Sequence, residues 1–124
     1  MPPPFSQPRS SRLLALRTRD FDRVYRRPAR RQQTRRFLVV ARRNELGRTR
    51  WGLSVKAQLG GAVVRNRVKR RLREILRRAQ RRQPVGWDVV VQPRASDTAT
   101  ADFAELTREL EGLLEAALRA EEGA

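Results

Sequence analysis

The chain has 124 residues, and its 29 Lys and Arg side chains outnumber 13 Asp and Glu, which gives a formal net charge of +16 and an isoelectric point near 11.9. It contains no Cys and no His, which excludes disulfides, Cys or His zinc sites, thiol nucleophiles and imidazole bases. The length fits one domain, and an excess of charge made mostly of Arg favours a nucleic-acid partner, because guanidinium groups match phosphate oxygens.

Charge and apolar content are unevenly distributed. Residues 1–96 carry 27 basic and 5 acidic side chains, and residues 97–124 carry 2 and 8, so we expect the C-terminal part to face away from a polyanion. We interpret residues 1–12 as a flexible basic arm, residues 13–120 as a single α+β domain that binds nucleic acid, and residues 121–124 as a tail. No apolar run could span a bilayer, and the N-terminus lacks the apolar core of a signal peptide. These features favour a cytoplasmic protein without membrane contact.

Three elements are expected in the first half of the chain. Phe21, Val24 and Tyr25 recur at helical spacing, which predicts a short helix with an apolar and aromatic edge. The aromatic and β-branched residues at 36–43 predict a strand. A second strand is expected at 51–56, where apolar and polar residues alternate, so that one face packs and the other stays polar.

A basic helix of about five turns is expected after the glycine pair at 60 and 61. Its apolar residues fall on one stripe at helical spacing: Val64, Val68, Leu72, Ile75, Leu76 and Ala79. Polar and basic residues form a row on the opposite side: Asn66, Arg70, Arg73, Arg77 and Arg81. The helix should bury the first set and present the second.

The remainder of the chain predicts one more strand and one more helix. The segment WDVVVQPR, which begins at Trp87, reads as a strand that ends at Pro93. Because a long helix separates it from the strand at 51–56, a β-α-β unit with at least one parallel pair is expected. Leucines at helical spacing from 103 to 118 predict a helix that covers the sheet. The fold class is therefore α+β, a small mixed sheet packed with helices.

The acidic residues do not form a catalytic or metal-binding cluster. The basic body of the chain holds five of them, scattered over several elements: Asp20, Asp22, Glu45, Glu74 and Asp88. Asp20 and Asp22 do not face each other on a helix, and acids in a first turn are explained by the helix dipole. We therefore expect neither a catalytic residue nor a metal ligand in this chain.

Two features have both a structural and a functional interpretation. The row from Arg70 to Arg81 could be a solvated helix face, but like charges at i and i+4 cost about a few tenths of a kcal/mol per pair, so we favour nucleic-acid contact. Phe21 and Tyr25 could stack unpaired bases or belong to the core. The residues alone favour the core.

The segment GLSVKAQLGGAVVRNRVKRRLRE, residues 52–74, resembles the signature of the bacterial ribonuclease P protein component. The early helix with DFDRVY, the strand that begins with RF, the late DVVV strand and the Leu-rich last helix also resemble that family, over roughly residues 13–118. The resemblance implies a ribosomal protein S5 domain 2-like fold with a left-handed β-α-β crossover, although such crossovers are rare.

The same resemblance implies a function. The chain would be the protein subunit of ribonuclease P, an endoribonuclease that removes the 5′ leader of precursor tRNA. Its partners would be ribonuclease P RNA and precursor tRNA, and not DNA or a membrane. The RNA would carry the active site and bind most of the Mg²⁺, so the protein alone is not expected to cleave.

Matching positions suggest which residues bind. Those carried over for the catalytic RNA are Arg65, Asn66, Arg67, Lys69, Arg70, Arg73 and Arg77. Those expected around the leader-binding cleft are Arg17, Phe21, Tyr25, Arg36, Phe37 and Lys56, so the resemblance favours a binding role for the aromatic pair. Ala57, Gln58 and Gly61 stand where the family often has other residues, commonly lysines, and Val40 stands where the family often has an aromatic residue.

Overall fold

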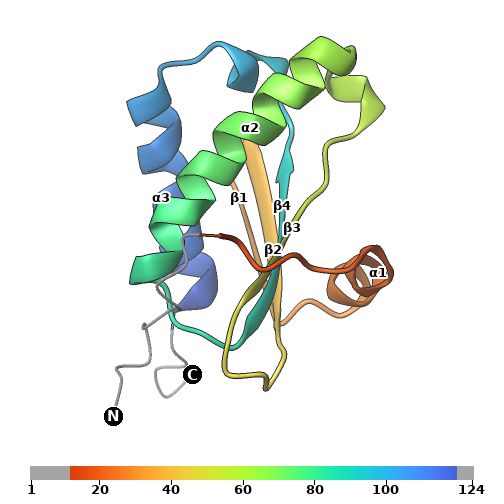
Figure 1. Ribbon diagram of the computed structural model, residues 1–124, viewed down its shortest axis with the longest axis vertical. Coiled ribbons are helices and arrows are strands. Elements are labelled where there is room, and N and C mark those ends of the chain that lie inside the picture. Colours follow the sequence, from red (N-terminus) through yellow and green to blue (C-terminus); the bar gives the residue numbers. More distant parts are fainter. Residues whose placement is uncertain (1–11, 120–124) are drawn as a thin grey trace.

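The computed structural model describes residues 12–119, which form one four-stranded sheet with a helix on one face and two helices on the other (Figure 1). The helices and strands are α1 (Thr18–Arg26), β1 (Arg30–Gln33), β2 (Phe37–Arg43), β3 (Arg50–Leu53), α2 (Ala62–Ala79), β4 (Trp87–Pro93) and α3 (Phe103–Leu118). Short 3₁₀ helices lie at η1 (Ala57–Leu59), η2 (Gln80–Arg82) and η3 (Ser96–Ala99). The expected α+β class is confirmed, whereas the tail and all but the last residue of the expected arm lie outside the described residues.

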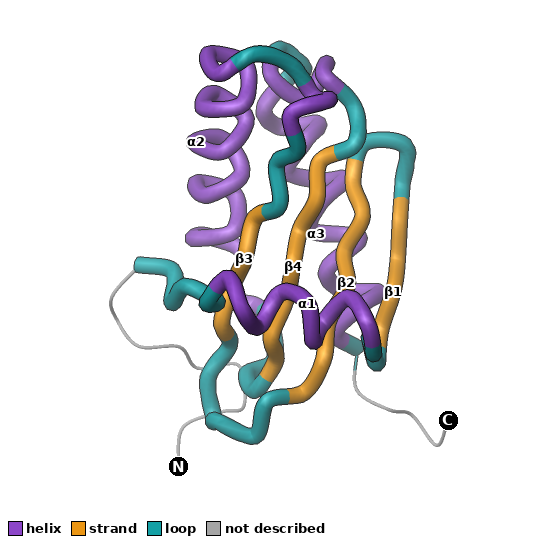
Figure 2. The backbone as a smooth tube through the Cα atoms, turned by 90° about the vertical axis from the view of Figure 1, so that its right-hand side faces the viewer, coloured by secondary structure: helices purple, strands orange, loops and turns teal. Residues whose placement is uncertain are grey.

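The sheet has the order β1-β2-β4-β3 and is mixed. β2 pairs antiparallel with both β1 and β4, and β3 pairs parallel with β4. In Figure 2, β3 and β4 run upward, β4 lies to the right of β3, and α2 returns behind the sheet, so the β3-α2-β4 crossover is left-handed. This connection departs from the right-handed rule for such units, as the family resemblance implies.

The main core lies between the sheet and the two helices α2 and α3. Phe37, Val39 and Ala41 of β2 point into it, whereas Leu38 and Val40 point to the α1 side. This alternation is the two-residue period of a strand. A smaller cluster under α1 contains Leu16, Val24, Leu38, Val40 and Val90. Both faces of the sheet are therefore covered. Two helices, α2 and α3, cover one face, and the single short helix α1 covers the other.

The edges of the sheet differ from the sequence-based expectation. β1 consists of Arg30 to Gln33, an entirely polar segment that was not predicted as a strand; it pairs with β2 through the backbone. The expected strand at 51–56 ends at Leu53. On its open side β3 is joined by the segment before α1, because Trp51 donates its backbone N–H to Leu14 O at 2.8 Å and accepts from Leu16 N–H at 2.8 Å.

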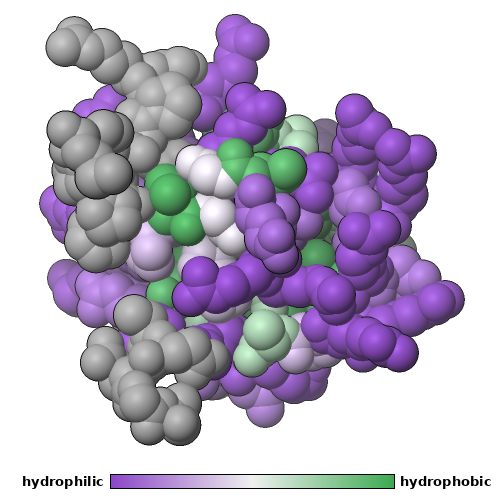
Figure 3. Space-filling view, turned by 90° about the horizontal axis from the view of Figure 1, so that it is seen from below, coloured by the Kyte–Doolittle hydropathy of each residue, from purple (hydrophilic) through white to green (hydrophobic). Residues whose placement is uncertain are grey.

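No helix among residues 12–119 is long and apolar enough to cross a membrane. On the face of the molecule seen in Figure 3, hydrophilic side chains cover most of the described surface, and apolar surface shows only in small areas between them. Among the described residues, the exposed large apolar side chains are Leu14, Leu46 and Val63, one from each of three separate segments. Such a surface presents charge rather than a broad apolar patch.

Candidate nucleic-acid interface

Gly60 shapes the turn that leads into α2. Gly60 has a φ of 153°, which L side chains rarely adopt, and a Cβ built there would lie 3.0 Å from Val64 Cγ1. The turn is closed by Arg65, whose backbone N–H donates to Gly61 O at 2.9 Å and whose Nε–H donates to Gly60 O at 3.1 Å. One of the guanidinium N–H groups of Arg65 is therefore already used in the turn, and its side chain is half-buried.

α2 separates apolar and basic residues as its periodicity predicts. Val68, Leu72, Ile75, Leu76 and Ala79 are buried, while Val64 is half-buried. We name the α2 face from the residues expected to bind RNA on this helix after Arg65: Asn66, Arg67, Lys69, Arg70, Arg73 and Arg77. Asn66, Arg67, Arg70 and Arg73 are exposed, and Lys69 and Arg77 are half-buried. Arg81 lies beyond the helix in η2.

One carboxylate modulates the charge of the α2 face. Glu74 accepts from Arg77, and it forms an ion pair with Arg78 at 2.8 Å. The hydrogen bond from Arg77 is the main cause of a lowered pKa for Glu74, so this carboxylate is ionised at neutral pH. Arg70 and Arg73 make no ion pair with any carboxylate between residues 12 and 119, so their guanidinium groups are available to a ligand.

The α2 face borders a groove of about 810 Å³, which we call the α2 groove. It is lined by residues of α2, of the segment before α1, of α1 and of β3. Its lining includes Leu13, Leu16, Phe21, Trp51, Leu53, Asn66, Lys69, Arg70, Arg73, Glu74 and Arg77. The structure thus brings an aromatic residue of α1 together with the cations of α2, two sets that the sequence places on separate elements.

The position of Phe21 depends on Gly52. A Cβ added at Gly52 would lie 2.4 Å from Phe21 Cζ, so only glycine lets the ring lie against β3. The start of α1 is held in place by Asp20, which forms an ion pair with Arg50 at 3.4 Å. Arg50 also binds Asp88 of β4 through two hydrogen bonds of 2.6 and 2.8 Å. Phe21 is half-buried and is therefore partly open to a ligand.

Tyr25 lies one turn further along α1 and contacts a different part of the sheet. Its hydroxyl donates to Gln92 Oε1 at 2.9 Å, and burial raises the pKa of Tyr25. Gln92 lines a second groove of about 740 Å³, which we call the sheet-end groove. Its polar lining consists of Arg35, Lys56, Gln58, Gln92, Arg94, Ser96 and Asp97. Lys56 therefore lines the same groove as Gln92, the hydrogen-bond partner of Tyr25. Arg17, which is exposed at the start of α1, lines neither groove.

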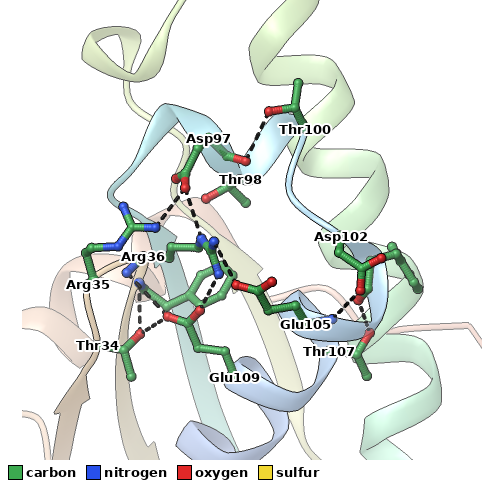
Figure 4. Close-up of polar contacts among 12 residues, drawn as sticks. Thr34, Arg35, Arg36, Asp97, Thr98, Thr100, Asp102, Glu105, Thr107 and Glu109 are labelled. Carbon is green, nitrogen blue, oxygen red and sulfur yellow. Dashed lines mark hydrogen bonds and ion pairs between the residues drawn. The ribbon is translucent and has the colours of Figure 1, made fainter.

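Arg36 and Phe37 do not lie where a leader-binding cleft was expected, so this part of the prediction is wrong. Phe37 has none of its surface exposed and packs in the core on the side of α2 and α3. Arg36 is turned toward η3 and α3, where Figure 4 shows its guanidinium among three carboxylates. It binds Glu109 at 2.9 Å, Glu105 at 3.1 Å and Asp97 at 3.3 Å.

The Arg36 cluster is a structural contact. The side chain of Arg36 is only 11% exposed, and its hydrogen bond with Glu109 raises its pKa. A hydrogen bond from Arg35 is the main cause of the lowered pKa of Asp97. Burial by itself raises the pKa of Glu109, but hydrogen bonds from Thr34 and Arg36 outweigh it, so the net shift is downward. The cluster ties the turn before β2 to α3, and leaves Arg36 little capacity for phosphate.

The acidic residues of α1 do not form a metal site. Asp20 is engaged by Arg50, and Asp22 forms an ion pair with Arg26 at 2.9 Å. No group of three potential metal-ligating side chains occurs among residues 12–119. Within the described residues, both carboxylates of α1 are therefore engaged by arginine side chains.

Several lining residues were not predicted from the sequence. Gln92 lies at the end of β4, Arg94 directly follows that strand, and Trp51 belongs to β3. The WDVVVQPR and RWGLSV patterns predict strands but do not say which grooves their ends border. Arg71 is also absent from the predicted set: it donates to Thr98 O at 3.0 Å and Ala101 O at 2.6 Å, so it joins α2 to the segment before α3.

Comparison with known proteins adds three findings. A family model described as Ribonuclease P matches residues 8–118. The ribonuclease P protein components of Ruegeria pomeroyi and Halorhodospira halophila are 41% and 46% identical to this chain; the alignments cover 89% and 86% of it and 90% and 84% of those proteins. The solved structure of the RNase P protein from Thermotoga maritima has a TM-score of 0.76 at 35% identity, covering 87% of this chain and 98% of that one.

Proposed function

Because the chain belongs to the bacterial ribonuclease P protein family, we propose that it binds the catalytic RNA of ribonuclease P through the α2 face and the 5′ leader of precursor tRNA through α1 and the adjoining sheet. Membership of the family makes it a ribonuclease P protein component. The partner proposed for each surface follows the family resemblance, and the charge and aromatic lining of the two grooves support it.

The α2 groove is the observation that supports this proposal most strongly. Arg70 and Arg73 have no carboxylate partner in the described part of the chain, so binding phosphate would not require the loss of an internal ion pair. Their guanidinium groups match phosphate oxygens in shape and charge. Arg67 and Lys69 extend this surface along α2. Because the contacts are ionic, affinity for RNA is expected to fall steeply with salt.

Phe21 and Tyr25 support leader binding. Both are half-buried on the α1 side of the sheet, and aromatic rings partly open to solvent can stack unpaired bases in a sequence-tolerant way. Lys56 and Arg94 in the sheet-end groove would meet the phosphates of a single strand that continues past Tyr25. In this proposal the leader is single-stranded, so its bases are accessible to the aromatic rings.

In this proposal the protein does not perform the chemistry. Mg²⁺ would be bound mainly by the RNA, which would position it to activate water and stabilise the leaving oxygen. The protein would lower the Mg²⁺ requirement by neutralising phosphates where catalytic RNA and substrate meet. The proposed place of action is the cytoplasm.

Reconstitution tests the proposal. The chain is mixed with bacterial ribonuclease P RNA and precursor tRNA at a Mg²⁺ concentration where the RNA alone is slow. We expect faster removal of the 5′ leader, and no cleavage by the chain without RNA. Binding of the RNA without any gain in cleavage would instead indicate a general RNA-binding protein, and Mg²⁺-dependent cleavage by the chain alone would indicate a protein nuclease.

A further inference from the structure

Trp51 carries a buried hydrogen-bond donor that the fold does not use. The residue is 4% exposed, and its indole Nε1–H has no acceptor within residues 12–119. Buried polar groups in native proteins nearly always have a partner, and an exception calls for an explanation such as a bound water, ion or ligand. The backbone of Trp51, in contrast, is fully engaged with Leu14 and Leu16.

The unpaired donor belongs to a residue that lines the α2 groove. Near it, Leu13, Leu53 and Leu76 supply apolar lining. The charged lining is cationic except for Glu74, which is already bound by Arg77 and Arg78. The volume of about 810 Å³ lies in the range of about 300 to 1,000 Å³ that small-molecule sites occupy.

A nucleotide combines the groups that this groove lacks. Its base is a flat ring with apolar faces, which suits the leucine side chains. Its carbonyl oxygens or ring nitrogens are acceptors, which suits an N–H that has none. Its phosphate suits guanidinium groups without carboxylate partners. An RNA duplex would supply only the phosphate, because its bases are stacked and paired. The unused indole N–H therefore favours an unpaired nucleotide.

We propose that the α2 groove holds one unpaired nucleotide of the RNA that α2 binds, with a base acceptor on Trp51 Nε1–H and the phosphate on Arg70 and Arg73. This inference rests on the proposed function and deepens it. Phosphate contacts alone would not distinguish paired from unpaired RNA, whereas the contact with the base requires an unpaired nucleotide. The indole N–H is itself buried, so insertion requires neighbouring side chains to move. The side chains of Arg70 and Arg73 are long, exposed and not held by ion pairs.

NMR spectroscopy of the indole N–H groups tests the proposal directly. The chain has two Trp residues, and Trp87→Phe assigns their two signals. Uridine 5′-monophosphate is expected to shift the Trp51 signal and leave the Trp87 signal in place, because Trp87 lies in the core beside Arg43 and does not line the groove. Inorganic phosphate, which has no base, should leave the Trp51 signal unchanged.

Two variants separate the base contact from the phosphate contact. Trp51→Phe keeps an aromatic ring and removes the N–H, so it should weaken binding of the monophosphate and of the catalytic RNA about fivefold, the value of one hydrogen bond, without changing phosphate binding. Arg70→Ala should weaken the binding of both uridine 5′-monophosphate and inorganic phosphate. Trp87→Phe is the matched control for replacing a Trp and should change none of them.

The proposal is overturned if Trp51→Phe binds the monophosphate as tightly as the parent chain, or if it loses affinity for phosphate and monophosphate equally. Unchanged phosphate binding by Trp51→Phe also shows that the groove is folded. The function of the chain is judged separately, from cleavage of precursor tRNA by the parent chain with ribonuclease P RNA. If the parent chain stimulates cleavage but Trp51→Phe gives either of these results, the nucleotide site is refuted and the proposed function is not.

Discussion

Replacement of Gly52 by alanine probes the contact between α1 and the sheet. The added Cβ would lie 2.4 Å from Cζ, 2.7 Å from Cε1 and 3.2 Å from Cε2 of Phe21. Ordinary contacts of a Cβ begin near 3.4 Å, so the ring must move by about 1 Å. The neighbour is a ring at the margin of α1 and half-buried, so it can tilt outward, away from β3.

The expected magnitudes follow from this displacement. Overpacking costs about 1 to 3 kcal/mol, and a ring that can tilt outward places Gly52→Ala near 1 kcal/mol of lost stability. Stacking of one base on an aromatic side chain contributes about 1 to 3 kcal/mol. Loss of about 1.4 kcal/mol of it would weaken binding of precursor tRNA about tenfold. Mature tRNA has no leader, and its binding should change much less.

The assay compares affinities for precursor and mature tRNA in the reconstituted complex. Gly112→Ala is the matched control, because Gly112 is exposed on α3 and its Cβ would meet no atom within 4 Å. Phe21→Ala should reproduce the loss, and adding Gly52→Ala to it should have little further effect, since neighbouring residues are not additive. Equal affinity of Gly52→Ala and the parent chain for precursor tRNA would refute a leader contact by Phe21.

Two further predictions concern charge. Arg70→Ala should lower affinity for the catalytic RNA and reduce the slope of log K against log salt by about one unit, whereas Arg108→Ala removes the same charge from α3 and should leave the slope unchanged; an unaltered slope in Arg70→Ala would count against phosphate contact. Arg36→Ala should lower the urea midpoint at neutral pH. The pKa values of Asp97 and Glu109 are lowered in the folded protein, so their contribution is complete above their unfolded pKa values of about 4 and disappears as pH falls below them. The difference between Arg36→Ala and the parent chain should therefore shrink near pH 3, and a constant difference would exclude an ionic origin.

Elements with a strong local pattern were predictable from the sequence. The apolar stripe of α2 recurs every three or four residues, so Val68, Leu72 and Ile75 identify both the helix and its buried side. β1 was missed because its polar residues pair with β2 through backbone groups, which carry no side-chain signal. The left-handed crossover came from the family resemblance, because no local pattern encodes handedness.

The candidate site was predictable only in part. The basic face of α2 follows from the same periodicity, but the groove beside it needs Trp51 and Phe21, which tertiary packing brings to α2. Phe37 was misplaced because alternation shows that residues 37 and 38 face opposite sides and not which side meets a ligand. Arg36 was misplaced because its partners lie 61 to 73 residues away in the chain, beyond the range of any local pattern.

Cleavage of precursor tRNA by ribonuclease P RNA at limiting Mg²⁺, with and without this chain, tests the central claim most directly. We expect the chain to accelerate removal of the 5′ leader under conditions where the RNA alone is slow, and to lose most of that effect when Arg70 and Arg73 are both replaced by alanine. Cleavage at the same rate with and without the chain would contradict the proposed function.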